Sequence, residues 1–234
     1  MTASENIKGY RKVRAAVWAI LLLWLVAVLI LGASGIFVRD PGAPPLPIFA
    51  GVVIPLLVFL AAFWSGGKFR DFVITLDLEV ASGIQAWRFG GLGFIALYTY
   101  GVLPGLFAWP AGLGDMAIGL TAPFIVFALR RRPDFVRSRI FAVWNLLGIL
   151  DLVNAVCLGA LSAFLGIGIN GEITTFPMAQ LPLVLIPTFF VPLFIMLHIA
   201  SLLQARRATA AGKICGWTGS PVAQCGHAHP MGKA

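Results

Sequence analysis

Six long apolar runs, separated by short basic loops, constrain the fold of this chain more than any other feature. They lie near residues 15–38, 46–64, 86–107, 112–129, 139–162 and 179–203. A helix crosses the hydrocarbon core of a bilayer, about 30 Å thick, with roughly 20 mostly apolar residues. Because backbone in lipid must satisfy its own hydrogen bonds, runs of this length are expected to be helices. The sequence therefore predicts an all-α, polytopic membrane helix bundle with six transmembrane helices.

The composition agrees with a membrane bundle and argues against a soluble domain. Of 234 residues, 59% are hydrophobic and 11% are charged, whereas soluble domains are about half apolar and a quarter charged. Six spans and their loops use nearly all of the chain. We therefore expect a basic cytoplasmic N-terminus at 1–14, the transmembrane domain at 15–203 and a flexible cytoplasmic tail at 204–234.

The positive charge lies at the ends of the apolar runs. A formal net charge of +8 can indicate a nucleic-acid partner, but that would require one basic soluble face. Here most Lys and Arg residues fall in connections expected on one side of the membrane: Lys8, Arg11, Lys12, Arg14, Lys68, Arg70, Arg130, Arg131, Arg132, Arg137, Arg139, Arg206, Arg207 and Lys213. Such residues stay preferentially in cytoplasmic loops. Both termini are therefore predicted to be cytoplasmic, with the lipid bilayer as partner and no nucleic acid.

Two segments are expected to differ from simple spanning helices. Between Phe69 and Ile84, apolar residues repeat at helical spacing, which favours an amphipathic helix in the headgroup region. Residues 74–80 also alternate as in a strand, but a lone strand would have no partner. Four prolines lie in the sixth run or just before it, and they are Pro177, Pro182, Pro187 and Pro192. Because proline bends a helix and frees a carbonyl, this helix is expected to pack inside the bundle.

Asp151 is the strongest functional candidate, because an ionisable group within a membrane span is costly and therefore usually has a purpose. It shares one helical face with Trp144, Gly148, Ala155, Gly159 and Ser162, and Asn145 and Asn154 flank that face. Small residues allow a neighbouring helix to approach closely, so Asp151 is expected to face another helix. This arrangement fits a proton or cation site, and it also fits a structural hydrogen bond between helices.

Asp115 and Arg88 are the next candidates. Asp115 is expected to open the fourth helix near the outer boundary, where it would cap the helix or bind a cation or polar substrate. Arg88 is expected at the inner mouth of the third helix, where it would reach lipid phosphate, pair with an acid of the inner connection at 65–83 or bind an anionic head group. If they share a cavity, Asp115, Asp151 and Arg88 would step from the outer to the inner surface. His198 is expected to stand alone at the inner interface.

The C-terminal tail offers a different chemistry. Cys225, His227 and His229 are ligand types that suit zinc or copper(I). Their spacing matches no structural zinc motif, so a disordered tail without metal is the other interpretation. The sequence contains no phosphate-binding loop and no plausible Ser-His-Asp or Cys-His constellation. We therefore expect no cofactor and assign no catalytic residue.

Three strings together resemble a group of uncharacterised bacterial multi-pass membrane proteins. They are WRFG at residues 87–90, LPGLFA and PAGLGD within residues 103–115, and WNLLGILD at residues 144–151. The resemblance covers about residues 85–160. It implies a location in the bacterial inner membrane and no known activity.

Three functional hypotheses follow from these residues. The leading one is a small transporter or permease-like protein in which Asp151 and Asp115 handle a proton or small cation and the kinked sixth helix moves. The second is a non-catalytic accessory subunit that packs against another membrane protein. The third is a lipid-modifying membrane enzyme that uses Arg88 for a phosphate and a carboxylate as base. A midplane cavity would favour the transporter, a closed core the subunit and a lateral cleft the enzyme.

Overall fold

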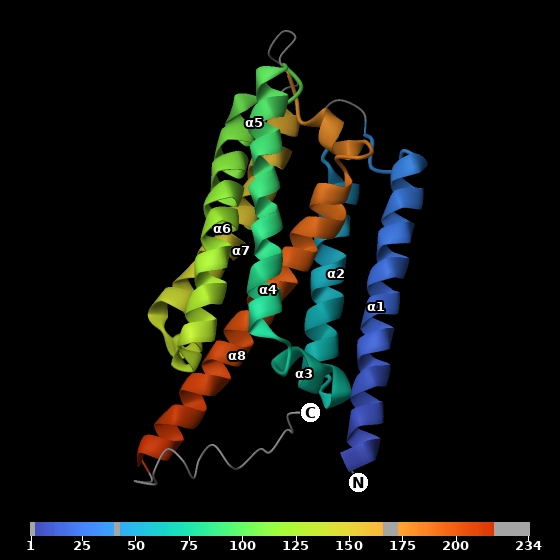
Figure 1. Cartoon of the computed structure of the whole chain (residues 1–234). Coiled ribbons are helices and arrows are strands. Elements are labelled where there is room, and N and C mark those ends of the chain that lie inside the picture. The colour runs from blue at the N-terminus through green and yellow to red at the C-terminus, as the bar shows by residue number, and fades with distance from the viewer. Residues whose placement is uncertain (1–2, 40–42, 166–172, 218–234) are drawn as a thin grey trace.

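The computed structural model describes residues 3–39, 43–165 and 173–217, and these residues form a bundle of helices (Figure 1). In chain order the elements are α1 (Ala3–Ala33), α2 (Leu46–Trp64), α3 (Gly67–Ile74), α4 (Leu78–Ile84), the 3₁₀ segment η1 (Gln85–Gly91), α5 (Leu92–Thr99), α6 (Gly105–Arg131), η2 (Pro133–Arg137), α7 (Arg139–Leu165), η3 (Phe176–Ala179), the π-helical segment η4 (Ile186–Phe190) and α8 (Val191–Trp217). No strand occurs in the described part of the chain, so the all-α prediction is confirmed.

Five helices of the described part are long and apolar enough to cross a membrane. They span Arg11–Ala33, Leu46–Trp64, Gly105–Arg131, Arg139–Ala163 and Ile186–Ala210. The third expected run, at 86–107, does not form one such helix. Instead α4, η1 and α5 follow one another without a gap from Leu78 to Thr99, and Figure 1 shows them as one green helical rod.

The turn after this rod determines where α6 begins. Gly101 has a φ of 68°, a left-handed conformation that glycine adopts without strain. Pro104, which follows shortly after, has extended backbone and precedes the first residue of α6. Since α6 starts at Gly105, Asp115 lies well inside the helix. The prediction that Asp115 caps this helix is therefore wrong.

Two short helices, α3 and α4, replace the single amphipathic helix expected between Phe69 and Ile84. Asp77 has extended backbone, and its Oδ1 accepts hydrogen bonds from two backbone N–H groups at the start of α4, at 2.8 and 3.2 Å. This is the geometry of an N-cap, which starts a new helix. Gln204 of α8 donates to backbone carbonyls on the α3 side of the break, at 3.0 and 2.9 Å. The break is thus held against α8.

The segment η4–α8 lies at the centre of the bundle. In the most apolar stretch of this span, 56% of the residues are buried, compared with 6% to 28% in the same stretches of the other four spans. Pro187 lies in η4 and Pro192 in the first turn of α8. The proline-rich run therefore packs inside the bundle as expected, although its first residues form η3 and turns.

The basic connections lie at one end of the bundle. Figure 1 shows the start of α1 and the end of α8 at the lower end, together with α3 and the connection from α6 to α7. That connection contains η2 and is rich in arginine. Arg39 lies in the connection from α1 to α2, which is at the opposite end. The charge asymmetry of the sequence is therefore also an asymmetry of the folded molecule.

Candidate functional site

Arg88 of η1 is buried at the centre of the bundle, with 2% of its surface exposed. Its Nε donates to Oδ1 of Asp115 at 2.7 Å, and its Nη2 donates to Oδ2 of Asp151. Asp115 belongs to α6 and Asp151 to α7, so one guanidinium joins three helical elements. The expectation that Arg88 reaches lipid phosphate at the inner surface is wrong, because two carboxylates inside the bundle pair with it.

The remaining nitrogen of the guanidinium contacts a neutral network. Nη1 of Arg88 donates to the carbonyl of Gly148 at 3.2 Å and lies 3.2 Å from Nε2 of His198. Nδ1 of His198 lies 2.9 Å from Oδ1 of Asn145. Because arginine can only donate, Nε2 must accept, and the ring proton must then sit on Nδ1 and be donated to Asn145. This pattern requires a neutral imidazole.

His198 is therefore a member of the cluster, and the expectation that it stands alone at the inner interface is wrong. It is 1% exposed, and its ring lies edge-on to Trp144 with centroids 5.3 Å apart. A sequence signal for this role exists. His198, Ser201 and Gln204 recur every third residue within an apolar run, which places them on one helical face.

Two glycines allow the charged side chains to approach this closely. A Cβ atom on Gly114 of α6 would overlap the carboxylate of Asp151, and a Cβ atom on Gly148 of α7 would overlap the imidazole of His198. Small residues are used in this way wherever membrane helices pack tightly. The glycines thus explain how two helices and a histidine can surround one arginine.

The small-residue face of α7 points inward, as its spacing predicts. Asp151 contacts Arg88, while Ala155 and Gly159 line a cavity on the same side of the helix. Ser162 is buried, and its Oγ has no hydrogen-bond partner among the described residues. Asn145 belongs to the cluster through His198, but Asn154 is exposed on another side of α7. Of the two flanking asparagines, the structure brings only Asn145 to the site.

The cluster holds two carboxylates and one guanidinium. With both carboxylates ionised it carries one negative charge in excess, because the imidazole is neutral. The side chains of Asp115 and Asp151 are each 14% exposed, whereas that of Arg88 is 1% exposed. Within the described part of the chain, Oδ2 of Asp115 and Oδ1 of Asp151 accept no hydrogen bond. The accessible atoms of the cluster are thus carboxylate oxygens.

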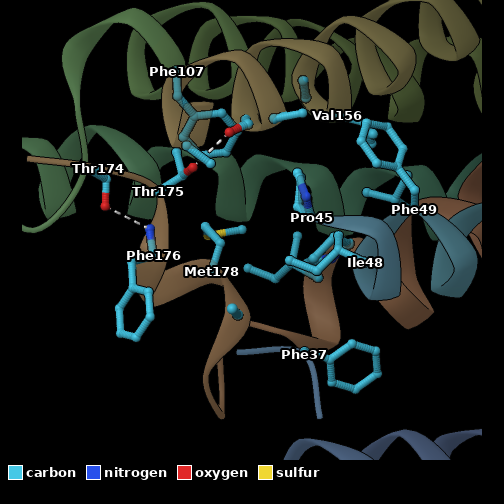
Figure 2. A pocket seen from close by; sticks show the side chains of 18 of the residues that line it. Phe37, Pro45, Ile48, Phe49, Phe107, Val156, Thr174, Thr175, Phe176 and Met178 are labelled. Atoms are coloured by element: carbon cyan, nitrogen blue, oxygen red, sulfur yellow. Dashed lines mark hydrogen bonds between the residues drawn. The ribbon is translucent and has the colours of Figure 1, made fainter. Parts of the chain in front are cut away.

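A cavity of about 260 Å³ lies beside the cluster. Figure 2 shows that apolar side chains dominate its wall, and the labelled ones include Phe37, Ile48, Phe49, Phe107, Val156 and Met178. Among the described lining residues, Asp115 is the only carboxylate. Arg39 and Thr174 also line it, and both belong to connections at the upper end of the bundle in Figure 1. The cavity therefore extends from that end toward Asp115.

Hydrogen bonds hold the segment before η3 over this cavity. Oγ1 of Thr175 donates to the carbonyl of Gly159 on α7 at 2.6 Å, and Oγ1 of Thr174 accepts from the backbone N–H of Phe176 at 3.2 Å. Both bonds are drawn in Figure 2. The segment at Thr174 and Thr175, which lines the cavity, is thus attached to α7, the helix that carries Asp151.

The three charged candidates meet at one place instead of stepping from outer to inner surface. Asp115 lines the cavity, while Arg88 and Asp151 lie behind it and are not among its lining residues. The candidate metal ligands Cys225, His227 and His229 lie outside the described residues. Within the described ranges, no group of three or more His, Cys, Asp or Glu side chains is placed to hold a metal ion.

Comparison with protein families shows which part of the chain forms a known domain. The model of a domain of unknown function, DUF8737, matches residues 43–206. The matched range contains the whole cluster and leaves out α1. Comparisons with curated proteins and with solved structures found no match.

Proposed function

The chain belongs to the family of the DUF8737 domain, and from the geometry of its site we propose that it is a small membrane transporter or permease-like protein. The cluster of Asp115, Arg88 and Asp151 handles a proton or a small cation. One observation carries this proposal: two carboxylates from different helices share a single buried arginine, and one of them also opens onto a cavity.

The energetics of buried charge support a functional role over a purely structural one. Well-packed apolar side chains often stabilise a protein as much as a buried ion pair does. Helix packing alone would therefore not require two carboxylates around one arginine. Ionisable groups within membrane spans typically mark ion pathways and proton relays. The excess negative charge gives this cluster a reason to take up a proton or a cation.

The contacts suggest how uptake and movement are linked. A cation that enters the cavity meets Oδ2 of Asp115, which pairs with no described residue, and weakens the pull of that carboxylate on Nε of Arg88. Arg88 then remains held by Asp151 and by His198 of α8. Because α8 continues from the proline-bearing, π-helical segment η4, a shift of His198 would be passed to a place where a helix can bend.

The proposal includes an orientation in the bacterial inner membrane. We place the basic end of the bundle, where α1 begins and α8 ends, in the cytoplasm, because Lys and Arg favour that side. The rod α4–η1–α5 then makes a sixth crossing in addition to the five long helices. In this orientation the cavity opens to the outer side of the membrane.

The test is ion flux in liposomes that contain the purified protein. With a pH-sensitive dye inside and an imposed potential, the wild type is expected to move protons or, in parallel assays, sodium or potassium faster than empty liposomes. Asp151→Asn should abolish this flux while the protein still elutes as a folded species in detergent. Glu79→Gln is the matched control, since Glu79 is a carboxylate in an exposed ion pair with Arg130.

Two results would contradict the proposal in different ways. Wild-type flux equal to that of empty liposomes, for all three ions, would remove the transporter function. Flux that is unchanged in Asp151→Asn would retain transport but remove the cluster as its site. A partner protein that co-purifies in fixed ratio, together with absent flux, would favour the accessory-subunit hypothesis.

A further inference from the structure

Two charged residues line the cavity: Arg39 lies at its upper end, and Asp115 lies at the end that reaches the cluster. Among the described lining residues, Asp115 is the only carboxylate. Arg88, whose positive charge pairs with it, is buried behind the wall. Oδ1 of Asp115 is occupied by Nε of Arg88 at 2.7 Å, whereas Oδ2 accepts no hydrogen bond from a described residue. A molecule deep in the cavity thus meets a carboxylate oxygen with free acceptor capacity. This favours a group that donates hydrogen bonds and carries positive charge.

The wall around this oxygen suits an apolar body. Phe94 and Phe107 line the cavity with Asp115, and their rings lie edge to face with centroids 5.3 Å apart. Aromatic faces attract cations, most strongly where water is excluded. Further along the wall, Ile48 and Met178 provide aliphatic and thioether surface. Around Asp115 the wall therefore offers mainly apolar contact, while Arg39, Thr174 and Thr175 are its other polar residues.

The space itself comes from small residues on α7. The cavity side of this helix carries Leu152 and Val156 and, in larger number, small residues that leave the volume open: Ala155, Gly159, Ala160 and Ala163. A cavity of about 260 Å³ lies just below the usual range of ligand pockets, roughly 300–1,000 Å³. Its occupant must therefore be small.

From these observations we propose that the cavity binds a small organic cation. Its ammonium group donates to Oδ2 of Asp115, and its apolar body lies against Phe94, Phe107 and the small-residue face of α7. A small organic cation would be the substrate of the proposed transporter, and this role rests on the transport function proposed above. Its experiment measures binding, which can succeed or fail independently of flux.

The experiment compares three probes that differ in charge and share one chain length: hexylammonium, hexanol and hexanoate. Each is titrated calorimetrically into purified full-length protein in a nonionic detergent, and the heat of titration into protein-free micelles is subtracted. Hexylammonium is expected to bind saturably and about tenfold or more tighter than hexanol, because a hydrogen bond to a charged group in a desolvated site is worth that much. Hexanoate is expected to bind weakest.

Two variants locate the binding. Asp115→Asn is expected to reduce the affinity for hexylammonium to that for hexanol. Because loss of this charge also disturbs Arg88, a second variant leaves the charges in place: Ala160→Phe fills the cavity and should abolish binding of all probes. Cys157→Phe is its matched control, since Cys157 lies on α7 but is exposed. This control should bind like the wild type.

Three results would overturn the proposal. They are equal saturable binding of hexylammonium and hexanol, tighter binding of hexanoate, and undiminished hexylammonium binding by Ala160→Phe. Tighter hexanoate binding would indicate that Arg39 at the mouth selects an anion instead. Hexylammonium binding without flux of protons, sodium, potassium or hexylammonium itself would contradict the transporter and keep the cavity assignment, whereas flux without such binding would contradict this inference alone.

Discussion

The guanidinium of Arg88 is suited to its position by its planar shape. Its nitrogens point in fixed directions, so Nε and Nη2 pair with carboxylates from two helices while Nη1 donates to Gly148 and lies against His198. A lysine ammonium is a point charge on a flexible stem and has no such fork. The residue type therefore determines that α6 and α7 meet η1 at one place.

Loss of Arg88 should leave two buried carboxylates without a cation. We expect Arg88→Met to destabilise the protein by about 3–5 kcal/mol, as measured when one partner of a buried ion pair is removed. The triple variant Arg88→Met, Asp115→Asn, Asp151→Asn should recover most of this loss, because no unpaired charge is left. Unfolding by denaturant in micelles measures both. Equal stability of Arg88→Met and the wild type would show that the arginine is not paired as described.

The close approach at Gly114 gives a second prediction. A methyl group there would meet the carboxylate of Asp151, so Gly114→Ala should destabilise the protein by about 1–3 kcal/mol, the usual range for overpacking. Gly93→Ala is the control, since a Cβ atom on that helical glycine meets nothing within 4 Å. Its stability should be unchanged or slightly higher. Thermal unfolding of the two variants measures both stabilities. A loss in Gly114→Ala alone shows that the effect comes from packing and not from the helix propensity of alanine.

At the scale of single residues, the sequence located some of this site and missed the rest. Asp151 was predictable as inward-facing because small residues share its face. The pairing of Arg88 was not, because the sequence placed Arg88 at an inner mouth and Asp115 at an outer one. The spacing of His198, Ser201 and Gln204 marks a polar helical face, but it does not reveal which residues His198 contacts. Its partners come from elements far apart in the chain.

Among the elements, the rod α4–η1–α5 differs most from its predicted form. Because Asp77 and Glu79 are charged, the sequence predicted that the first part of this rod is a surface connection. In the folded chain Glu79 forms an exposed ion pair with Arg130, with Nε and Oε2 2.5 Å apart. Glu79 itself belongs to α4, so the helical rod includes this charged residue. The 3₁₀ turn that carries Arg88 follows. Such a turn within a helical rod often marks a functional position.

The break between α3 and α4 can be tested through its cap. Asp77→Ala removes the acceptor for two backbone N–H groups of α4, so stability should fall by about 1 kcal/mol, the typical cost of losing an N-cap. Asp71→Ala is the matched control, because Asp71 is an exposed aspartate within α3. Denaturant unfolding of both variants gives the comparison. A loss of equal size in the two variants would point to general surface charge instead.

For the molecule as a whole, chain length and hydropathy predict the number of long helices better than they predict the cavity. Each apolar run is a local property of the sequence, and five of the runs contain helices long enough to span. The cavity depends on side chains from segments as distant as Phe37, Phe107 and Met178. No local pattern records that these will meet, so the cavity had to come from the structure.

The proposed orientation predicts which ends of the bundle a reagent can reach. In a background with all three cysteines replaced by serine, Arg39→Cys should react with a membrane-impermeant maleimide added to intact spheroplasts. Asp134→Cys, in the arginine-rich connection at the other end, should react only after permeabilisation. Both positions are exposed, so burial does not limit labelling. The reverse pattern would invert the orientation, and labelling of both from outside would contradict it.

The most direct measurement concerns the guanidinium of Arg88 itself. In the nuclear magnetic resonance spectrum of protein labelled with ¹⁵N at arginine, the Nε–H signal of Arg88 should persist after transfer to D₂O, because this group is buried and donates to Asp115 at 2.7 Å. The signal should disappear in Arg88→Lys, which assigns it, and should shift in Asp115→Asn. If the Nε–H of Arg88 exchanges as fast as those of surface arginines, the arginine is not enclosed between the two carboxylates and the account is wrong.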